Sequence, residues 1–169
     1  MSDAQPSTVI RHAGLLALRV AGLWRGVMIE GDSGAGKSDL ALRAMSEGLS
    51  LVSDDRTVVF VSDGRLYGRA PDALSGRIEA RGVGILVVAS VGIAEILILA
   101  RCVAAPAAVE RHPDFAAQTL LGIGVATIDI VPLEASGPAK LRHCLEHLGR
   151  RRQPGYLALL APPERLLGA

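Results

Sequence analysis

Short apolar runs cover most of the first half of the chain, and the polar residues between them divide it into strand-sized pieces. The apolar pattern predicts a strand, a turn and a second strand over residues 9–20, and another strand over residues 22–29. Apolar residues at helical spacing predict a helix over residues 38–47, which ends at Gly48 because glycine is favoured just beyond a helix end. A strand, a loop and a helix therefore follow one another directly.

Turn-forming residues predict an antiparallel pairing further along the chain. A short strand begins at Leu51, and residues 57–61 and 65–67 then flank Ser62-Asp63-Gly64, which is typical of a tight hairpin. A sheet that contains such a hairpin is mixed rather than purely parallel. The remaining predicted elements are a loop with a short helix over residues 106–118, a strand over 125–131 and a helix over 139–149.

One long apolar segment, residues 83–100, resembles a membrane span at first sight. Two glycines and Glu95 interrupt it, and β-branched residues crowd it, which argues against a spanning helix. The pattern fits two buried strands better, at residues 84–89 and 93–100, joined by a turn near Gly92. We therefore expect no membrane association.

The composition favours an α/β architecture in one domain over residues 1–169, with flexible ends at 1–8 and about 150–169. Half of the residues are apolar but only 3% are aromatic, so Val, Ile, Leu and Ala must build the core. The net charge of +1 offers no general attraction for a nucleic acid. Cys102 and Cys144 lack metal-ligand spacing, and no secretory signal precedes the domain, so we expect a reduced, cytoplasmic setting.

A phosphate loop lies between the strand at 22–29 and the helix at 38–47. It fits G-x-x-x-x-G-K-[ST] at every fixed position and consists of Gly31, Asp32, Ser33, Gly34, Ala35, Gly36, Lys37 and Ser38. Such a loop wraps its backbone N–H groups around phosphates at the positive end of the following helix. We expect Lys37 to reach the outer phosphates of a nucleoside triphosphate and Ser38 to bind its magnesium ion. The alternative is a glycine-rich turn that binds nothing.

Two adjacent carboxylates stand at the end of the short strand that begins at Leu51. Asp54 and Asp55 occupy a place where phosphate-loop folds commonly direct a carboxylate at the metal ion or at the attacking hydroxyl group. Adjacent residues of a strand point to opposite faces, so the two need not share a role. Asp54 is a candidate magnesium ligand. The alternative is a turn-opening pair beside Arg56.

Three motifs together resemble the catalytic domain of the HPr kinase/phosphorylase family. They are the phosphate loop, Leu51-Val52-Ser53-Asp54-Asp55, and Ile78-Glu79-Ala80-Arg81-Gly82-Val83-Gly84-Ile85. The resemblance runs from about Ile10 to Lys140. It implies a phosphoenolpyruvate-carboxykinase-like fold, the use of ATP and Mg²⁺, phosphorylation of a serine of HPr, a small phosphocarrier of the sugar phosphotransferase system, and assembly as hexamers. The chain is expected to be the short form, without the N-terminal domain of the full-length members.

The resemblance also implies roles for individual residues. Asp55 matches the residue that takes the serine proton, Lys37 matches the lysine that holds the β- and γ-phosphates, and Ser38 and Glu79 match the magnesium ligands. His12 matches a histidine near the catalytic aspartate.

Arg111 matches the catalytic arginine of the family by its place in the local pattern Glu110-Arg111-His112. Without the resemblance, a packing histidine at position 12 and a solvated ion pair at Arg111 are the simpler interpretations.

The chain departs from the family after its last predicted strand. The family commonly has a Pro-Gly-Arg-Asn type loop there, which is linked to the phosphorylase reaction, whereas residues 134–140 read Glu-Ala-Ser-Gly-Pro-Ala-Lys. Whether the chain also catalyses the reverse reaction is therefore not decided by the resemblance. His143 and His147 lie four residues apart on the predicted last helix, but two histidines without a third ligand indicate surface residues rather than a metal site.

These observations predict an ATP- and Mg²⁺-dependent serine kinase that acts on an HPr-type carrier, with phosphorolytic dephosphorylation as a further activity to test. One alternative is a phosphate-loop kinase with a small-molecule substrate, which would need a substrate lid. No insertion beyond residues 106–118 is long enough for one. Another alternative is a catalytically weak nucleotide-binding regulatory module, against which the intact Lys37, Ser38, Asp55 and Glu79 argue.

Overall fold

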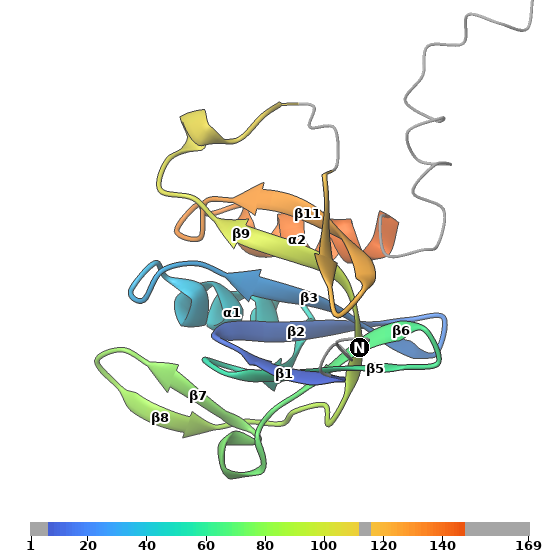
Figure 1. Cartoon of the computed structure of the whole chain (residues 1–169). Coiled ribbons are helices and arrows are strands. Elements are labelled where there is room, and N and C mark those ends of the chain that lie inside the picture. Colours follow the sequence, from blue (N-terminus) through green and yellow to red (C-terminus); the bar gives the residue numbers. More distant parts are fainter. Residues whose placement is uncertain (1–6, 112–115, 148–169) are drawn as a thin grey trace, which may run out of the picture.

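The computed structural model describes residues 7–111 and 116–147. A curled sheet of nine strands carries both helices on one face (Figure 1). Its strands are β1 (Thr8–Arg11), β2 (Ala13–Val20), β3 (Leu23–Glu30), β4 (Ser50–Ser53), β5 (Thr57–Ser62), β6 (Arg65–Arg69), β9 (Ala94–Cys102), β10 (Ala117–Leu120) and β11 (Ile123–Ile130). The other elements are the helices α1 (Lys37–Ser46) and α2 (Gly137–His147), the 3₁₀ turns η1 (Asp72–Leu74) and η2 (Pro106–Ala108), and the strands β7 (Arg77–Ala80) and β8 (Gly84–Val87), which pair only with each other.

The large sheet is mixed, as the hairpin signal predicts. Its strand order is β1-β5-β6-β9-β3-β2-β4, and β11 pairs with β9 and with β10. β9 runs parallel to β3 and to β11, while the other pairings are antiparallel. The two strands predicted over residues 9–20 are confirmed as β1 and β2, and the predicted hairpin is confirmed as β5 and β6.

Glycine marks the places where the backbone must turn sharply. Gly48 follows the end of α1 with φ of +90°, and Gly64 stands in the β5–β6 turn with φ of +69°. Both angles lie in the left-handed region that glycine adopts without a steric penalty. The end of the predicted helix at Gly48 is therefore confirmed.

The large sheet is buried on both faces. On one face Leu16, Val27 and Ile29 pack in one apolar cluster with residues of both helices, among them Leu40 and Leu141. The opposite face has its own cluster, because the sheet curls around it; its buried members include Leu15, Met28, Val59, Leu99 and Leu120. Alternate residues of β2 and β3 thus point into different clusters, and the continuous apolar runs in the sequence follow from this double burial.

The prediction of two buried strands between residues 83 and 100 is half correct. β9 is buried, but β8 lies on a hairpin outside the large sheet, where Val83, Ile85 and Val87 are 75%, 69% and 82% exposed. The physical reason is its pairing: β8 bonds only to β7, so one of its faces packs on the core and the other meets solvent. Figure 1 shows this hairpin apart from the sheet.

Smaller differences occur at the ends of the predicted elements. α2 begins at Gly137 rather than at Ala139, and Gly149 lies outside the described residues. The predicted short helix near position 106 is η2, and β10 begins at Ala117. Residues 1–6 and 150–169 also lie outside the described part, whereas Thr8, expected in a flexible end, pairs with β5. Of the helices that the structure describes, neither α1 nor α2 is long and apolar enough to cross a bilayer.

Candidate active site

The phosphate loop, residues 31–38, leaves the end of β3 and passes directly into α1, the arrangement that its sequence motif requires. A Cβ atom on Gly31 would lie 2.6 Å from the Cβ of Cys102 in the neighbouring strand β9, so only glycine fits at this position. Gly34 and Gly36 have φ of +80° and +100°. Close packing and backbone conformation therefore both explain the glycines of the motif.

Lys37 is the first residue of α1, and its side chain folds back over the phosphate loop. Its Nζ donates hydrogen bonds of 2.8 Å to the backbone oxygens of Gly31 and Asp32. The loop thus already holds the ammonium group that the sequence assigns to the phosphates. Two carbonyl acceptors keep this charge at the mouth of the loop.

Asp54 forms hydrogen bonds with two segments that lie far from it in the sequence. Its Oδ1 accepts a 2.8 Å hydrogen bond from the Ser38 hydroxyl, and its Oδ2 accepts a 3.0 Å bond from the backbone N–H of Glu79 in β7. The three candidate magnesium ligands therefore lie side by side. Their oxygens are of the kind that Mg²⁺ prefers.

Asp55 turns away from Asp54 and takes a different partner. Its Oδ1 lies 2.6 Å from Nε2 of His12, and the two side chains are 59% and 51% exposed. His12 precedes β2, whose first residue Ala13 pairs with Glu30 at the end of β3. The start of β2 and the end of β4 meet at the edge where the phosphate loop begins, and this brings the pair beside the loop.

Buried hydroxyl groups hold this edge in place. Thr57, fully buried, donates a 2.8 Å hydrogen bond to the carbonyl oxygen of Ala13, and its Oγ1 lies 2.5 Å from Oγ of Ser53. Since the single Thr57 proton goes to Ala13, Ser53 is the donor in the second bond. The two hydroxyls flank the turn that carries Asp55 and bind the residue that follows His12, so they fix the spacing between the pair.

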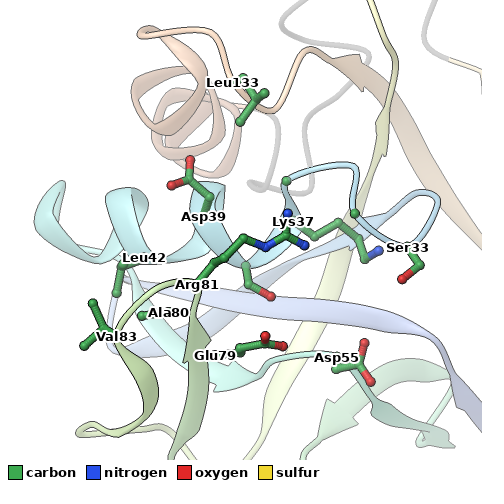
Figure 2. Close-up of a pocket in the computed structure, with 13 residues that line it drawn as sticks. Ser33, Lys37, Asp39, Leu42, Asp55, Glu79, Ala80, Arg81, Val83 and Leu133 are labelled. Atoms are coloured by element: carbon green, nitrogen blue, oxygen red, sulfur yellow. The ribbon is translucent and has the colours of Figure 1, made fainter.

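One cavity of about 450 Å³ collects most of these side chains (Figure 2). It is lined by Ser33, Gly34, Gly36, Lys37, Ser38, Asp39, Leu42, Asp55, Glu79, Ala80, Arg81, Val83 and Leu133. Figure 2 shows the Arg81 side chain reaching from the end of β7 toward Lys37, with the carboxylates of Glu79 and Asp55 nearby. Positive and negative groups thus face the same space.

Arg81 is a site residue that was not predicted from sequence, although it belongs to the motif at residues 78–85. The motif itself was the signal, because Arg81 lies two residues after Glu79, just beyond the end of β7. Arg111 is exposed, and it is not among the described residues that line the cavity. The structure therefore brings together every predicted site residue of the chain's first 80 positions, but not Arg111.

Burial shifts the pKa of both cysteine thiols. Burial raises the pKa of Cys102 above its ordinary value, and the ammonium of Lys37 partly offsets this rise. Burial also raises the pKa of Cys144, to about 11. Both cysteines are free, and both are protonated thiols at neutral pH.

Residues 7–99 match the family model described as the HPr Serine kinase C-terminal domain. The chain belongs to this family. Within the matched range lie the phosphate loop, both aspartates, His12 and the Glu79–Arg81 segment, whereas Arg111 and residues 134–140 lie outside it. The family residues that the structure gathers around the cavity are thus those that the family model covers.

Curated relatives match over a limited stretch. The chain is 50% identical to the HPr kinase/phosphorylase of Levilactobacillus brevis over 62 residues, which is 36% of this chain and 20% of that protein. It is 46% identical to the HPr kinase/phosphorylase of Variovorax paradoxus over 65 residues, 38% of this chain and 20% of that protein. The matched stretch thus spans about a fifth of the length of these relatives.

A solved structure extends the likeness over the fold. The Hpr(Ser) kinase/phosphatase from Coxiella burnetii superimposes with a TM-score of 0.70 and 24% identity, over 90% of this chain and 99% of that chain. The predicted fold, a mixed-sheet α/β phosphate-loop domain of the kind found in this family, is confirmed.

Proposed function

We propose that this chain is a cytoplasmic, ATP- and Mg²⁺-dependent protein serine kinase that phosphorylates an HPr-type phosphocarrier. The observation that carries the proposal is the arrangement around one cavity: Lys37 over the phosphate loop, the Ser38–Asp54–Glu79 cluster, and the His12–Asp55 pair. Family membership supports the same activity.

The residues present fit a nucleotide and its metal ion. The glycines leave the loop backbone open. Within the part of the chain that the structure describes, the Lys37 ammonium donates hydrogen bonds to loop carbonyl oxygens, so it can turn to phosphate oxygens. Mg²⁺, held by Ser38, Glu79 and Asp54, would neutralise charge on the phosphates.

The side chains in and beside the cavity have separate roles in the reaction. Asp55 accepts the proton of the acceptor serine while the serine oxygen forms its bond to the γ-phosphorus of ATP and the bond to the departing ADP breaks. His12 holds the Asp55 carboxylate in position through their 2.6 Å contact. Arg81 meets the charge of the transferring group with a planar, always protonated guanidinium. The role of Arg111 rests on the family resemblance alone.

The hairpin beside the cavity favours a protein acceptor over a small molecule. Val83 lines the cavity, and Val83, Ile85 and Val87 share one exposed apolar face. Exposed apolar groups that adjoin a polar active site are typical of protein docking surfaces. A small-molecule kinase would have no use for an apolar face outside its cavity, so this surface favours the carrier protein as substrate.

We also propose that the reverse reaction, in which inorganic phosphate removes the phosphoryl group, is slow. In residues 134–140 the single cation, Lys140, forms an ion pair with Glu134. A paired ammonium binds a free phosphate more weakly than the two-pronged guanidinium of an arginine would.

The family resemblance implies assembly as hexamers. We propose that this chain forms homo-oligomers, which light scattering of the purified protein would reveal.

Transfer of label from γ-labelled ATP to a purified HPr-type carrier tests the proposal. We expect a serine phosphoester on the carrier, its complete loss with Lys37→Ala, and little change with the control Lys140→Ala. Binding of ATP without transfer would favour the regulatory module, and label on sugars or nucleosides without any carrier would favour the small-molecule kinase. Incubating the phosphorylated carrier with phosphate, without ATP, measures the reverse rate; pyrophosphate release as fast as the forward reaction would contradict slow reversal.

A further inference from the structure

The last turns of α2 bring together three side chains that share ligand chemistry. His143, Glu146 and His147 stand at positions i, i+3 and i+4, which lie on one face of a helix. Each offers one nitrogen or oxygen atom, and these atoms all lie within 4.8 Å of one another. The two histidines, which the sequence analysis assigned to the surface for want of a third ligand, therefore have one in Glu146.

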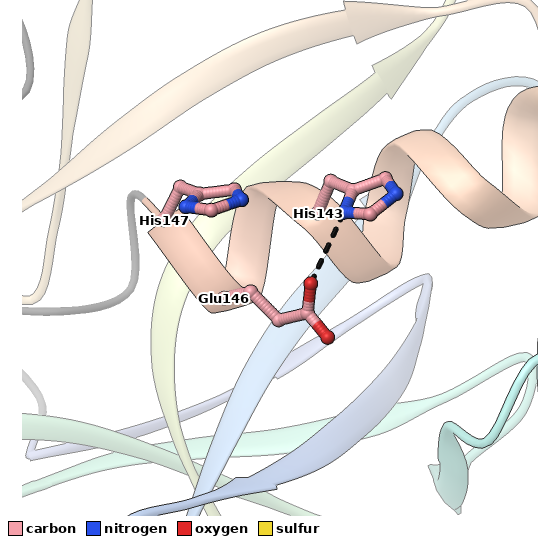
Figure 3. A group of neighbouring side chains, drawn as sticks. All are labelled: His143, Glu146 and His147. Carbon is pink, nitrogen blue, oxygen red and sulfur yellow. Dashed lines mark hydrogen bonds and ion pairs between the residues drawn. The ribbon is translucent and has the colours of Figure 1, made fainter.

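His143 already contacts the other two groups, and Figure 3 shows its interaction with Glu146. Nδ1 of His143 lies 3.0 Å from Oε2 of Glu146, and the rings of His143 and His147 stack with their centroids 6.0 Å apart and their planes 19° from parallel. Two ligands of one tetrahedral zinc ion, at bond lengths of about 2.0–2.2 Å, are separated by roughly 3.4 Å. Small rotations of the exposed His143 and His147 side chains would therefore bring all three atoms onto a common ion.

Arg142 orients the carboxylate from its other side. Its Nε donates a 2.9 Å hydrogen bond to Oε1 of Glu146, and its Nη1 donates a 2.6 Å bond to the carbonyl oxygen of Glu47 at the end of α1. Oε1 is thus held by the guanidinium while Oε2 faces His143. Partners of this kind, which fix a ligand's orientation, are a regular feature of metal sites. The charge of Arg142 opposes a cation, so the affinity must come mainly from the imidazoles.

We propose that His143, Glu146 and His147 form a binding site for a divalent transition-metal ion, separate from the phosphate-loop magnesium site. Two imidazole nitrogens and one carboxylate oxygen suit Zn²⁺, Ni²⁺ or Cu²⁺, whereas Mg²⁺ and Ca²⁺ take oxygen ligands. An ion that links positions i and i+4 closes the last turn of α2. Since Leu141 and Leu145 of the same helix are buried in the core, the bound ion stabilises the folded chain.

Zinc titration of the metal-free, nucleotide-free chain tests this proposal, with excess Mg²⁺ present to occupy the oxygen ligands of the phosphate-loop site. Competition with a chromophoric chelator gives the affinity, and the melting temperature gives the linked stability. We expect one zinc ion per chain and a rise in melting temperature with zinc concentration. His143→Gln, His147→Gln and Glu146→Gln should each weaken binding by on the order of tenfold or more, since loss of even a supporting group costs about 10–100-fold.

The control is His12→Gln, which removes one imidazole outside α2 and should leave zinc affinity unchanged. His143 is 65% exposed, so its substitution removes a ligand without opening the core, and far-UV circular dichroism of each variant verifies this. Zinc affinity that survives the combined loss of His143 and His147, or that falls instead with His12→Gln, would overturn the proposal.

Discussion

Thr57→Val should destabilise the fold through its hydroxyl group alone. Valine has nearly the shape of threonine but neither donates to the Ala13 carbonyl nor accepts from the Ser53 hydroxyl. Thr57 is fully buried and Ser53 is 1% exposed, so water cannot replace the lost partner. The Ser53 hydroxyl is left without an acceptor, and the Ala13 carbonyl loses a donor.

The expected magnitude follows from these two losses. An unsatisfied buried group costs about 1–3 kcal/mol, and the net loss of an ordinary hydrogen bond costs about 0.5–1.5 kcal/mol. We therefore expect the free energy of unfolding to fall by about 2–4 kcal/mol. For a domain of this size, each kcal/mol lowers the melting temperature by about 2–4 °C, so the total decrease is roughly 5–15 °C.

Urea denaturation, followed by circular dichroism, measures this change, with Thr57→Ser as the matched control. Serine keeps the hydroxyl and loses only a methyl group, so it should cost less than Thr57→Val. The surviving folded protein should also turn over more slowly with the carrier, because the His12–Asp55 spacing is relaxed and a displacement of about 1 Å can cost 10²-fold. A valine variant as stable as the unaltered chain, or less destabilised than the serine variant, would refute the reasoning.

Three further predictions concern the side chains of the site. Asp55→Asn should lower turnover by about 10²–10⁴-fold at nearly unchanged ATP affinity, and adding His12→Gln should cost little more, because groups that act as a unit are not additive; a fully additive loss in single-turnover kinetics would separate them. Lys37→Met should slow the alkylation of Cys102 by iodoacetamide in nucleotide-free protein, since the pKa of this thiol rises further without the ammonium and less thiolate is present, whereas Lys37→Arg should not. Arg81→Gln should lower kcat by about 10²–10³-fold and ATP affinity much less, and an equal fall in both would assign Arg81 to ground-state binding.

The phosphate loop could be predicted from sequence because its function depends on local geometry. A strand, eight residues of fixed type and a helix determine where Lys37 and Ser38 lie relative to the loop backbone. The hairpin of β5 and β6 was predictable for the same reason, since Gly64 specifies its turn. Contacts between residues that are close in sequence can be predicted from the local residue pattern.

The remainder of the site depends on pairings between distant segments. The contact of Asp54 with Glu79 joins residues 25 apart, and the contact of His12 with Asp55 joins residues 43 apart. No local pattern specifies such distances, which is why the family resemblance was needed to connect them. The exposure of β8 was missed similarly, because a wholly apolar strand has the same sequence pattern whether one face or both are covered.

The third ligand on α2 was missed for a different reason. His143, Glu146 and His147 are close in sequence, and helical spacing alone places them on one face. Glu146 was therefore predictable as a third ligand from the local sequence, without any long-range pairing.

The structure separates the residues that stabilise this site from those that would react in it. The His12–Asp55 pair is more than half exposed, and exposed ion pairs contribute about 0–1 kcal/mol to stability. The hydroxyls of Ser53 and Thr57, which hold the pair in position, are buried and contribute more. An inactive Asp55 variant should therefore fold normally, whereas loss of activity on substitution of Thr57 should be accompanied by loss of stability. Measuring both quantities on both variants distinguishes a reacting group from a positioning group.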